Sequence, residues 1–180
     1  MKISVSAPQF SPAPAIVISP YQWVKLAVSQ QNPTHVISIL GSTDRLPWPL
    51  LEDPKVLRLC FDDTYLSTKY AVGPTPQQIR SLIDFAKEWG GRSSILIHCR
   101  AGASRSPSAA LIAAAAIGRR DLFARLLEAK TYFRPNRRML ELAGKILADD
   151  ELRLLKPADH TGKPISKWGV AAISLTLGRP

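Results

Sequence analysis

The chain has few cysteines, few histidines and no long hydrophobic run. Two of its 180 residues are Cys and three are His, which is too few for a disulfide framework, and no spacing among them is typical of a metal site. The longest apolar run, Ala109 to Ile117, is far too short to cross a bilayer. The N-terminus lacks the apolar core of a signal peptide. We therefore expect no membrane span, no metal and no secretory leader.

Acidic residues are also scarce, since 14 Asp and Glu stand against 24 Lys and Arg, and the net charge is +10. This charge indicates either a solvated basic surface or an attraction for anionic substrates, and it does not decide the fold. The length suits one domain with a hydrophobic core. We expect that domain to cover residues 1–155. The tail, residues 156–180, is interrupted by Pro and Gly and is expected to be docked or mobile.

Short apolar runs alternate along the chain with segments of helical periodicity. Strands are expected at 35–40, 56–61 and 94–98, and helices at 20–30, 76–89, 107–117, 121–134 and 137–148. Ser19 and Thr75 each begin a capping-box pattern, and Asn136 is placed to cap the last helix. Because strands and helices alternate, the predicted fold class is α/β, with a mostly parallel central sheet flanked by helices.

One stretch, residues 95–108, combines a short apolar run with a polar loop and a helix start. The apolar run ends in His98 and Cys99, and the loop leads to Arg105, Ser106 and Pro107. Pro is favoured at the first position of a helix, with Ser before it as the cap. A loop between a strand and a helix N-terminus directs backbone N–H groups at one point, and this geometry binds an anion.

The residue types in this loop favour nucleophilic chemistry on phosphorus. The thiolate is the nucleophilic form of Cys99, and both a helix N-terminus and a nearby cation stabilise it. Arg105 has a planar guanidinium that suits two phosphate oxygens, and Gly102 permits backbone conformations that other residues resist. The alternatives are that Cys99 is a small buried hydrophobic residue and that Arg105 is a solvated charge.

The run from His98 to Ser106, His-Cys-Arg-Ala-Gly-Ala-Ser-Arg-Ser, resembles the signature loop of the cysteine-dependent protein tyrosine phosphatases, and most of all their dual-specificity branch. The resemblance spans roughly residues 15–150 and implies a protein tyrosine phosphatase-like fold without a cofactor. It implies that Cys99 forms a phosphocysteine, that Arg105 clamps the phosphoryl oxygens and that Ser106 assists breakdown of the intermediate. His98 would hold the loop and support the thiolate. The amides expected to bind the phosphate are those of Arg100, Ala101, Gly102, Ala103, Ser104 and Arg105.

The leaving group of such a reaction needs a proton, and water needs a base in the second step. Asp62 and Asp63 follow a predicted strand, where acids are also common turn residues. By the resemblance, the general acid lies in a loop upstream of the cysteine. We expect Asp63 to be this acid, with Asp62 as the next candidate and Asp44 as the third.

Two further residues have two readings each. The resemblance implies that Asn136 braces the phosphate loop, but the same residue is explained by a plain helix cap. Cys60 precedes the acid pair and is either a core residue or a partner of Cys99 under oxidation.

The expected function is phosphoric monoester hydrolysis through a phosphocysteine, as in protein tyrosine or dual-specificity phosphatases, with a phosphorylated protein or another anionic phosphomonoester as substrate. One alternative is a non-catalytic phosphate-binding module. Another is a phosphatase for inositol lipids or RNA 5′ ends, since Arg100 adds a cation to the loop although the loop lacks Lys. Nucleic acid is not the expected partner. A working thiolate needs a reducing compartment, so we expect the protein in the cytoplasm.

Overall fold

The computed structural model of the chain describes residues 14–41, 44, 54–128, 133–155 and 173–177. The strands are β1 (Ala15–Pro20), β2 (His35–Leu40), β3 (Lys55–Cys60), β4 (Ile95–Cys99) and β5 (Ile173–Thr176). The helices are the 3₁₀ turn η1 (Tyr21–Trp23), α1 (Val24–Gln31), α2 (Pro76–Trp89), α3 (Arg105–Ala116), α4 (Arg120–Glu128), α5 (Arg137–Leu147) and α6 (Asp150–Leu154). No helix in these segments is long and apolar enough to cross a membrane.

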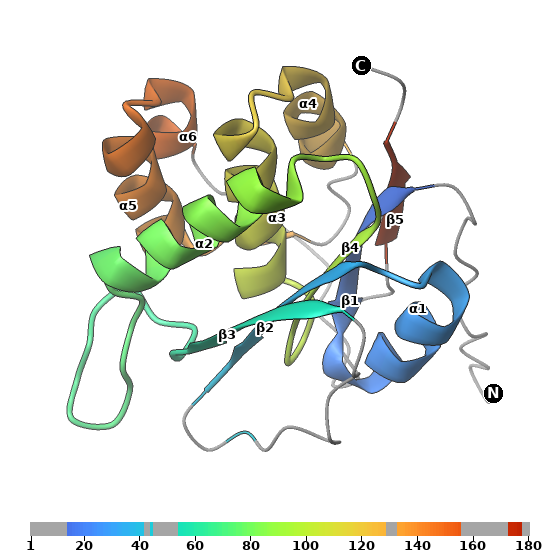
Figure 1. Cartoon of the computed structure of the whole chain (residues 1–180). Coiled ribbons are helices and arrows are strands. Elements are labelled where there is room, and N and C mark those ends of the chain that lie inside the picture. Colours follow the sequence, from blue (N-terminus) through green and yellow to red (C-terminus); the bar gives the residue numbers. More distant parts are fainter. Residues whose placement is uncertain (1–13, 42–43, 45–53, 129–132, 156–172, 178–180) are drawn as a thin grey trace, which may run out of the picture.

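The five strands form one sheet in the order β3-β2-β4-β1-β5. The pairs β3–β2, β2–β4 and β4–β1 are parallel, and β5 is antiparallel to β1. Helices α2 to α6 cover one face of the sheet and α1 covers the other (Figure 1). The predicted α/β fold with a mostly parallel sheet is therefore confirmed. β5 comes from the tail segment, and it extends the sheet beyond β1.

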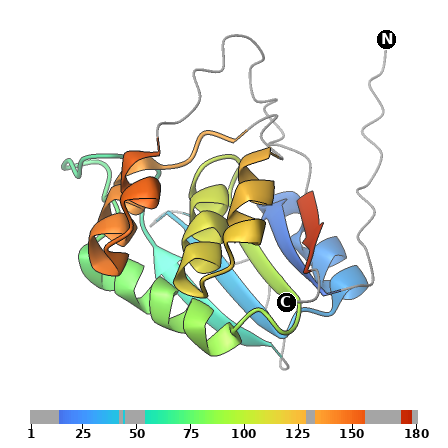
Figure 2. The same cartoon turned by 90° about the horizontal axis from the view of Figure 1, so that it is seen from above.

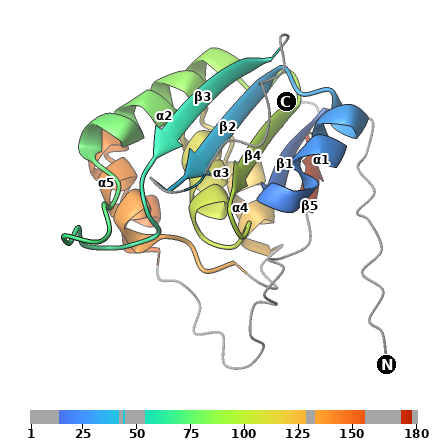
Figure 3. The same ribbon diagram turned by 90° about the horizontal axis from the view of Figure 1, so that it is seen from below.

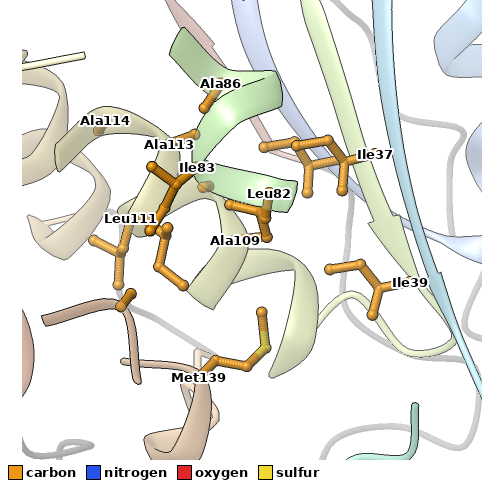
Figure 4. Close-up of a cluster of buried hydrophobic side chains, with 14 of the residues drawn as sticks. Ile37, Ile39, Leu82, Ile83, Ala86, Ala109, Leu111, Ala113, Ala114 and Met139 are labelled. Atoms are coloured by element: carbon orange, nitrogen blue, oxygen red, sulfur yellow. The ribbon is translucent and has the colours of Figure 1, made fainter. Parts of the chain in front are cut away.

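The alternation of side chains along the strands separates two cores. Ile16 and Ile18 of β1 face α2, α3, α4 and α5, whereas Ala15 and Val17 pack with α1. Figure 4 shows the larger core, where Ile37 and Ile39 of β2 lie opposite Leu82 of α2 and close to α3. Ala109, Ala110, Ala113 and Ala114 of α3 are fully buried, and their small side chains let this helix approach the sheet closely.

The capping boxes predicted at Thr75 and Ser19 can be compared with the N-termini of the helices in the structure. Thr75 makes the predicted capping box with Gln78, and α2 ends at Trp89 as expected. The box at Ser19 is wrong, because Ser19 belongs to β1 and its hydroxyl bonds to the carbonyl of Pro20. The chain then passes through η1 before α1 begins.

Helix α3 begins at Arg105, two residues earlier than predicted, with Ser104 at the N-cap position. Pro107 is thus the third helical residue instead of the first. The first N–H groups of a helix have no acceptor within it, so a proline there removes no hydrogen bond. Ser106 is consequently not the cap, and its hydroxyl is directed at other groups.

The carboxyl ends of the four parallel strands lie at one edge of the sheet, where open α/β sheets place their ligands. The register pairs Cys99 of β4 with Pro20 of β1 and with Ile39 of β2. The chain therefore leaves β2, β3 and β4 at the same edge of the sheet, and the loops after β3 and β4 are seen from below in Figure 3. These loops carry the polar residues that the sequence analysis singled out.

Candidate active site

Cys99 ends β4 and is buried, with 2% of its surface exposed. The backbone N–H of Gly102 donates to its Sγ atom at 3.3 Å, and the hydroxyl oxygen of Ser106 lies 3.2 Å from the same sulfur. Hydrogen-bond donors aimed at a sulfur stabilise negative charge on it. The predicted nucleophile thus lies among donors, and the reading of Cys99 as a simple hydrophobic residue does not explain them.

Three carbonyl groups of the phosphate loop, residues 100–105, accept hydrogen bonds from residues outside the loop. The carbonyl of Arg100 accepts from the N–H of Tyr21 at 3.2 Å, and that of Ala103 accepts from the N–H of Arg134 at 2.8 Å. The carbonyl of Ser104 accepts from both the N–H and the hydroxyl of Ser108. A carbonyl and the N–H of the next residue point in opposite directions across a trans peptide, so the N–H groups of Ala101, Ser104 and Arg105 point away from these outer partners, and the N–H of Gly102 points at Sγ. Inward amides of this kind form an anion-binding concavity.

Gly102 makes this turn possible. Its φ angle is +71°, in the left-handed region that side chains with a Cβ atom adopt only under strain.

Arg105 stands at the first position of α3 and is buried, with 7% of its surface exposed. Its Nη1 atom donates to the carbonyl oxygen of Phe61 at 2.8 Å. Its Nε atom is buried and has no hydrogen-bond partner among the described residues. An unsatisfied buried donor costs about 1–3 kcal/mol, and an anion in the phosphate loop would satisfy it. The reading of Arg105 as a solvated charge is wrong.

The structure separates the three candidate acids. One oxygen of Asp63, Oδ1, accepts from the hydroxyl of Ser104 at 2.7 Å and from the amide of Asn136 at 2.8 Å. Asp62 instead accepts from the N–H of Val72 at 2.8 Å and closes the base of its own loop. Of the adjacent acid pair, Asp63 is therefore the one whose carboxylate contacts the phosphate loop.

Asp44 is tied to the side chain of Arg100. Its carboxylate accepts hydrogen bonds from Nη1 of Arg100 at 2.6 Å and from the backbone N–H of Gly41 at 2.9 Å. The Asp44 side chain is only 12% exposed, while that of Arg100 is 73% exposed. The extra cation of the loop is thus already paired with a carboxylate at the rim of the site.

Asn136 combines its two predicted roles in a way that the sequence did not indicate. It caps α5 by accepting from the N–H of Met139 at 3.1 Å. Its amide donates to Asp63 and not to the phosphate loop, which is braced instead by the backbone N–H of Arg134. The backbone N–H of Asn136 donates to the hydroxyl of Ser108 at 2.6 Å. Asn136 therefore acts on the loop through its neighbours.

Ser104 and Ser108 are the residues whose side chains the sequence analysis missed. The sequence predicts a role for the backbone amide of Ser104 only, and none for Ser108. Their hydroxyls connect the phosphate loop to Asp63 and to the start of α5. The only sequence signal was the density of hydroxyl residues around Arg105.

His98 is nearly fully buried, and this burial lowers the pKa of its imidazole to about 4. The ring is consequently neutral near pH 7 and adds no positive charge beside the thiolate. Its Nδ1 atom has no hydrogen-bond partner in the described part of the chain, and the ring packs 6.5 Å from that of Tyr21. His98 therefore places a neutral, buried ring at the start of the loop.

The lowered pKa of His98 predicts a pH-dependent stability. Above pH 6.5 the imidazole is neutral in both the folded and the unfolded chain. Between pH 6.5 and about 4 the unfolded chain binds a proton that the folded chain does not. The free energy of unfolding therefore falls as the pH is lowered, by at most about 1.4 kcal/mol per pH unit. Urea unfolding at pH 7 and pH 5 should show a smaller fall for His98→Gln than for the wild type. Burial also lowers the pKa of His35, but this contribution is common to both proteins; equal slopes would contradict the prediction.

Cys60 is exposed, so its reading as a core residue is wrong. Strand β2 lies between the strands that carry the two cysteines, because Leu40 pairs with Cys60 and Ile39 with Cys99. Two strand spacings of about 4.8 Å each exceed the roughly 7 Å between Cα atoms that a disulfide spans. The sheet therefore keeps Cys60 and Cys99 out of bonding reach.

No protein-family model and no curated protein matches the chain by sequence. Among solved structures, DUSP15 is similar at 20% identity with a TM-score of 0.52, over 80% of this chain and 91% of that one. The human tyrosine phosphatase-like serine/threonine/tyrosine-interacting protein is similar at 18% identity and a TM-score of 0.54, over 74% of this chain and 91% of that one. PTPMT1 in complex with PI(5)P is similar at 14% identity and a TM-score of 0.52, over 77% of this chain and 91% of that one. The chain therefore has the fold of the dual-specificity phosphatases, as the resemblance of its signature loop predicts.

Proposed function

We propose that the protein is a phosphoric monoester hydrolase that acts through a phosphocysteine on phosphorylated proteins. The observation that carries this proposal is the buried, unpartnered Nε–H of Arg105, in a loop whose Gly102 N–H points at the sulfur of Cys99. A cation and inward amides around a thiolate are the arrangement that nucleophilic attack on a phosphate requires.

In the first step the thiolate of Cys99 attacks phosphorus, and the S–P bond forms as the bond to the leaving oxygen breaks. The loop amides and Arg105 bind the non-bridging oxygens, whose charge is thereby neutralised. Asp63 gives its proton to the leaving oxygen, which departs as an alcohol or phenol. The donors of Ser104 and Asn136 both bind Oδ1 of Asp63, which leaves the other oxygen to carry that proton.

In the second step water attacks phosphorus, and the S–P bond breaks. Asp63, now a carboxylate, takes a proton from the water as a general base. The hydroxyl of Ser106, 3.2 Å from Sγ, donates a hydrogen bond to the departing thiolate. Inorganic phosphate leaves, and the site returns to its starting charge.

Two alternative functions are a non-catalytic phosphate-binding role and the hydrolysis of a phosphorylated lipid. A non-catalytic role is compatible with the fold, since one similar structure is named a phosphatase-like interacting protein. A lipid substrate is suggested by the PI(5)P complex of PTPMT1. The pairing of Arg100 with Asp44 weakens the positive potential that a multiply charged headgroup needs, and therefore favours a protein substrate.

The test is hydrolysis of p-nitrophenyl phosphate by the purified wild-type protein, followed by a comparison of phosphopeptides, inositol lipids and RNA 5′-phosphates. Turnover that is highest on phosphopeptides supports the proposal. Binding of phosphate without any turnover would establish the non-catalytic alternative. Preference for inositol lipids would replace the protein substrate while leaving the chemistry in place.

Replacing the acid should show leaving-group dependence. Asp63→Asn is expected to lower kcat on phenyl phosphate by about 10²–10⁴-fold, the usual range for a general acid. The loss should be smaller on p-nitrophenyl phosphate, because its phenolate leaves readily without a proton. The basic limb of the pH–rate profile, which reports the protonated acid, should disappear.

Asp62→Asn is the matched control, since Asp62 binds its own loop and not the phosphate loop. Its ratio of kcat on phenyl phosphate to kcat on p-nitrophenyl phosphate should equal that of the wild type. The basic limb of its pH–rate profile should also be retained. If Asp62→Asn gives the larger leaving-group effect and Asp63→Asn gives none, the assignment of the acid is reversed.

A further inference from the structure

Four of the five large hydrophobic side chains that are exposed in the described residues lie on one loop. They are Tyr65, Leu66, Tyr70 and Val72, with exposures of 45%, 65%, 84% and 53%. Exposed apolar residues that occur singly are ordinary, whereas four on one short loop are unusual, and exposed apolar surface of this kind is typical of binding sites. This loop joins β3 to α2 and begins directly after the strand that leads to Asp63.

The β3–α2 loop, residues 61–75, is fixed by its own hydrogen bonds. At its base the backbone N–H of Asp62 donates to the carbonyl oxygen of Val72 at 2.7 Å. At its tip the hydroxyl of Thr68 accepts from the N–H groups of Tyr70 and Ala71. A surface that is ordered before binding loses little conformational entropy on binding. The apolar side chains are thus displayed by a prearranged loop.

The loop is continuous with the candidate active site. Asp63, near its start, contacts Ser104 of the phosphate loop, and the hydroxyl of Tyr65 donates to Glu141 of α5 at 2.7 Å. From these anchors the loop extends outward beyond α2 and α5, as Figures 1 and 2 show. A substrate with its phosphate in the phosphate loop therefore has its neighbouring residues beside this surface.

Cations accompany the aromatic rings on the loop. The ammonium group of Lys69 lies 4.7 Å from the ring centre of Tyr70, and the guanidinium of Arg137 lies 5.9 Å from that of Tyr65. The side chains of Arg137 and Tyr65 share one carboxylate, that of Glu141. An apolar surface with cations at its edge complements a ligand that combines apolar and acidic side chains.

We propose that the exposed side chains of the β3–α2 loop bind the segment that flanks the phosphorylated residue of a protein substrate, and that they select apolar residues next to acidic ones. The inference rests on the proposed function for its substrate class. It adds a specificity surface outside the groups that perform the chemistry.

The test uses synthetic phosphotyrosine peptides that carry a Leu-Glu pair at one of several positions from one to six residues on either side of the phosphotyrosine. A peptide with Gly-Ser in place of each pair is the reference. The wild type should show a kcat/KM about tenfold higher for the best Leu-Glu position, which is the gain expected from burying one apolar side chain. The double variant Leu66→Ser, Tyr70→Ser should lose this preference, while its kcat/KM for p-nitrophenyl phosphate stays at the wild-type value.

Leu154→Ser is the matched control, because Leu154 on α6 is 66% exposed but lies outside this loop. It should keep the wild-type preference. The inference is overturned if no position gives a preference in either hydrolysis or binding, if the double variant keeps the preference, or if Leu154→Ser loses it equally. It is also overturned if the double variant instead loses binding to phosphatidylserine vesicles, which would make the loop a membrane contact.

The proposed function and this inference fail separately. Fluorescence anisotropy of the same labelled peptides with the Cys99→Ser protein measures binding in the absence of turnover. A preference in binding that the loop variant abolishes supports the surface even if the wild type hydrolyses nothing. Hydrolysis without any preference supports the chemistry and removes the surface.

Discussion

Cys99→Ser is expected to abolish turnover, with a loss on the order of 10⁶-fold in kcat, as when a covalent nucleophile is removed from an enzyme. The serine hydroxyl occupies almost the same volume but stays protonated at neutral pH, so it does not attack phosphorus. The N–H of Gly102, now 3.3 Å from Sγ, and the buried Arg105 remain in place. The affinity for inorganic phosphate should therefore stay close to that of the wild type. Steady-state hydrolysis of p-nitrophenyl phosphate and calorimetric titration with phosphate measure the two quantities.

Cys60→Ser provides the control for this substitution. It is the same chemical change at the other cysteine, which is exposed and separated from Cys99 by β2. Activity equal to that of the wild type is expected from it, both in reducing buffer and after mild oxidation, because no disulfide joins the two positions and oxidation of Cys99 itself affects both proteins alike. Turnover of Cys99→Ser within about tenfold of the wild type would reject the covalent mechanism.

The parts of the fold that depend on near neighbours in the sequence were predictable. The bounds of β2 and α2 follow from an apolar run that ends at Gly41 and from the reciprocal bonds of Thr75 and Gln78. The phosphate loop was predictable for the same reason, because its nucleophile, turn and cation lie within seven consecutive residues. Local stereochemistry decides such elements.

The parts that depend on distant segments were not predictable. The resemblance ranks Asp63 above Asp62, but only the contacts from Ser104 and Asn136 show which of the two carboxylates reaches the phosphate loop. The neutrality of His98 results from burial by surrounding elements. β5 was missed because its place beside β1 depends on pairing across most of the chain. Tertiary packing sets all three, and the local sequence pattern does not contain it.

Arg105→Lys is expected to lower kcat/KM on p-nitrophenyl phosphate by about 10³–10⁵-fold, the range for arginines that neutralise a transferred phosphoryl group. The guanidinium has two tasks in this site. Its Nη1 is held by the carbonyl of Phe61 at 2.8 Å, and its Nε–H is left for the anion. A lysine ammonium keeps the charge but is a single point donor on a flexible stem, so it does not hold both partners in a fixed plane.

Arg105→Lys and Cys99→Ser are expected to differ in phosphate affinity. The dissociation constant for inorganic phosphate should rise in Arg105→Lys, because the clamp itself is lost, and should stay unchanged in Cys99→Ser. Arg80→Lys, the same change at an exposed position of α2, should leave both kcat/KM and phosphate affinity at wild-type values. A loss below about tenfold in Arg105→Lys, with unchanged phosphate affinity, would place the guanidinium away from the phosphoryl group. The buried Nε–H would then require another partner, and the observation on which the proposed function rests would be removed.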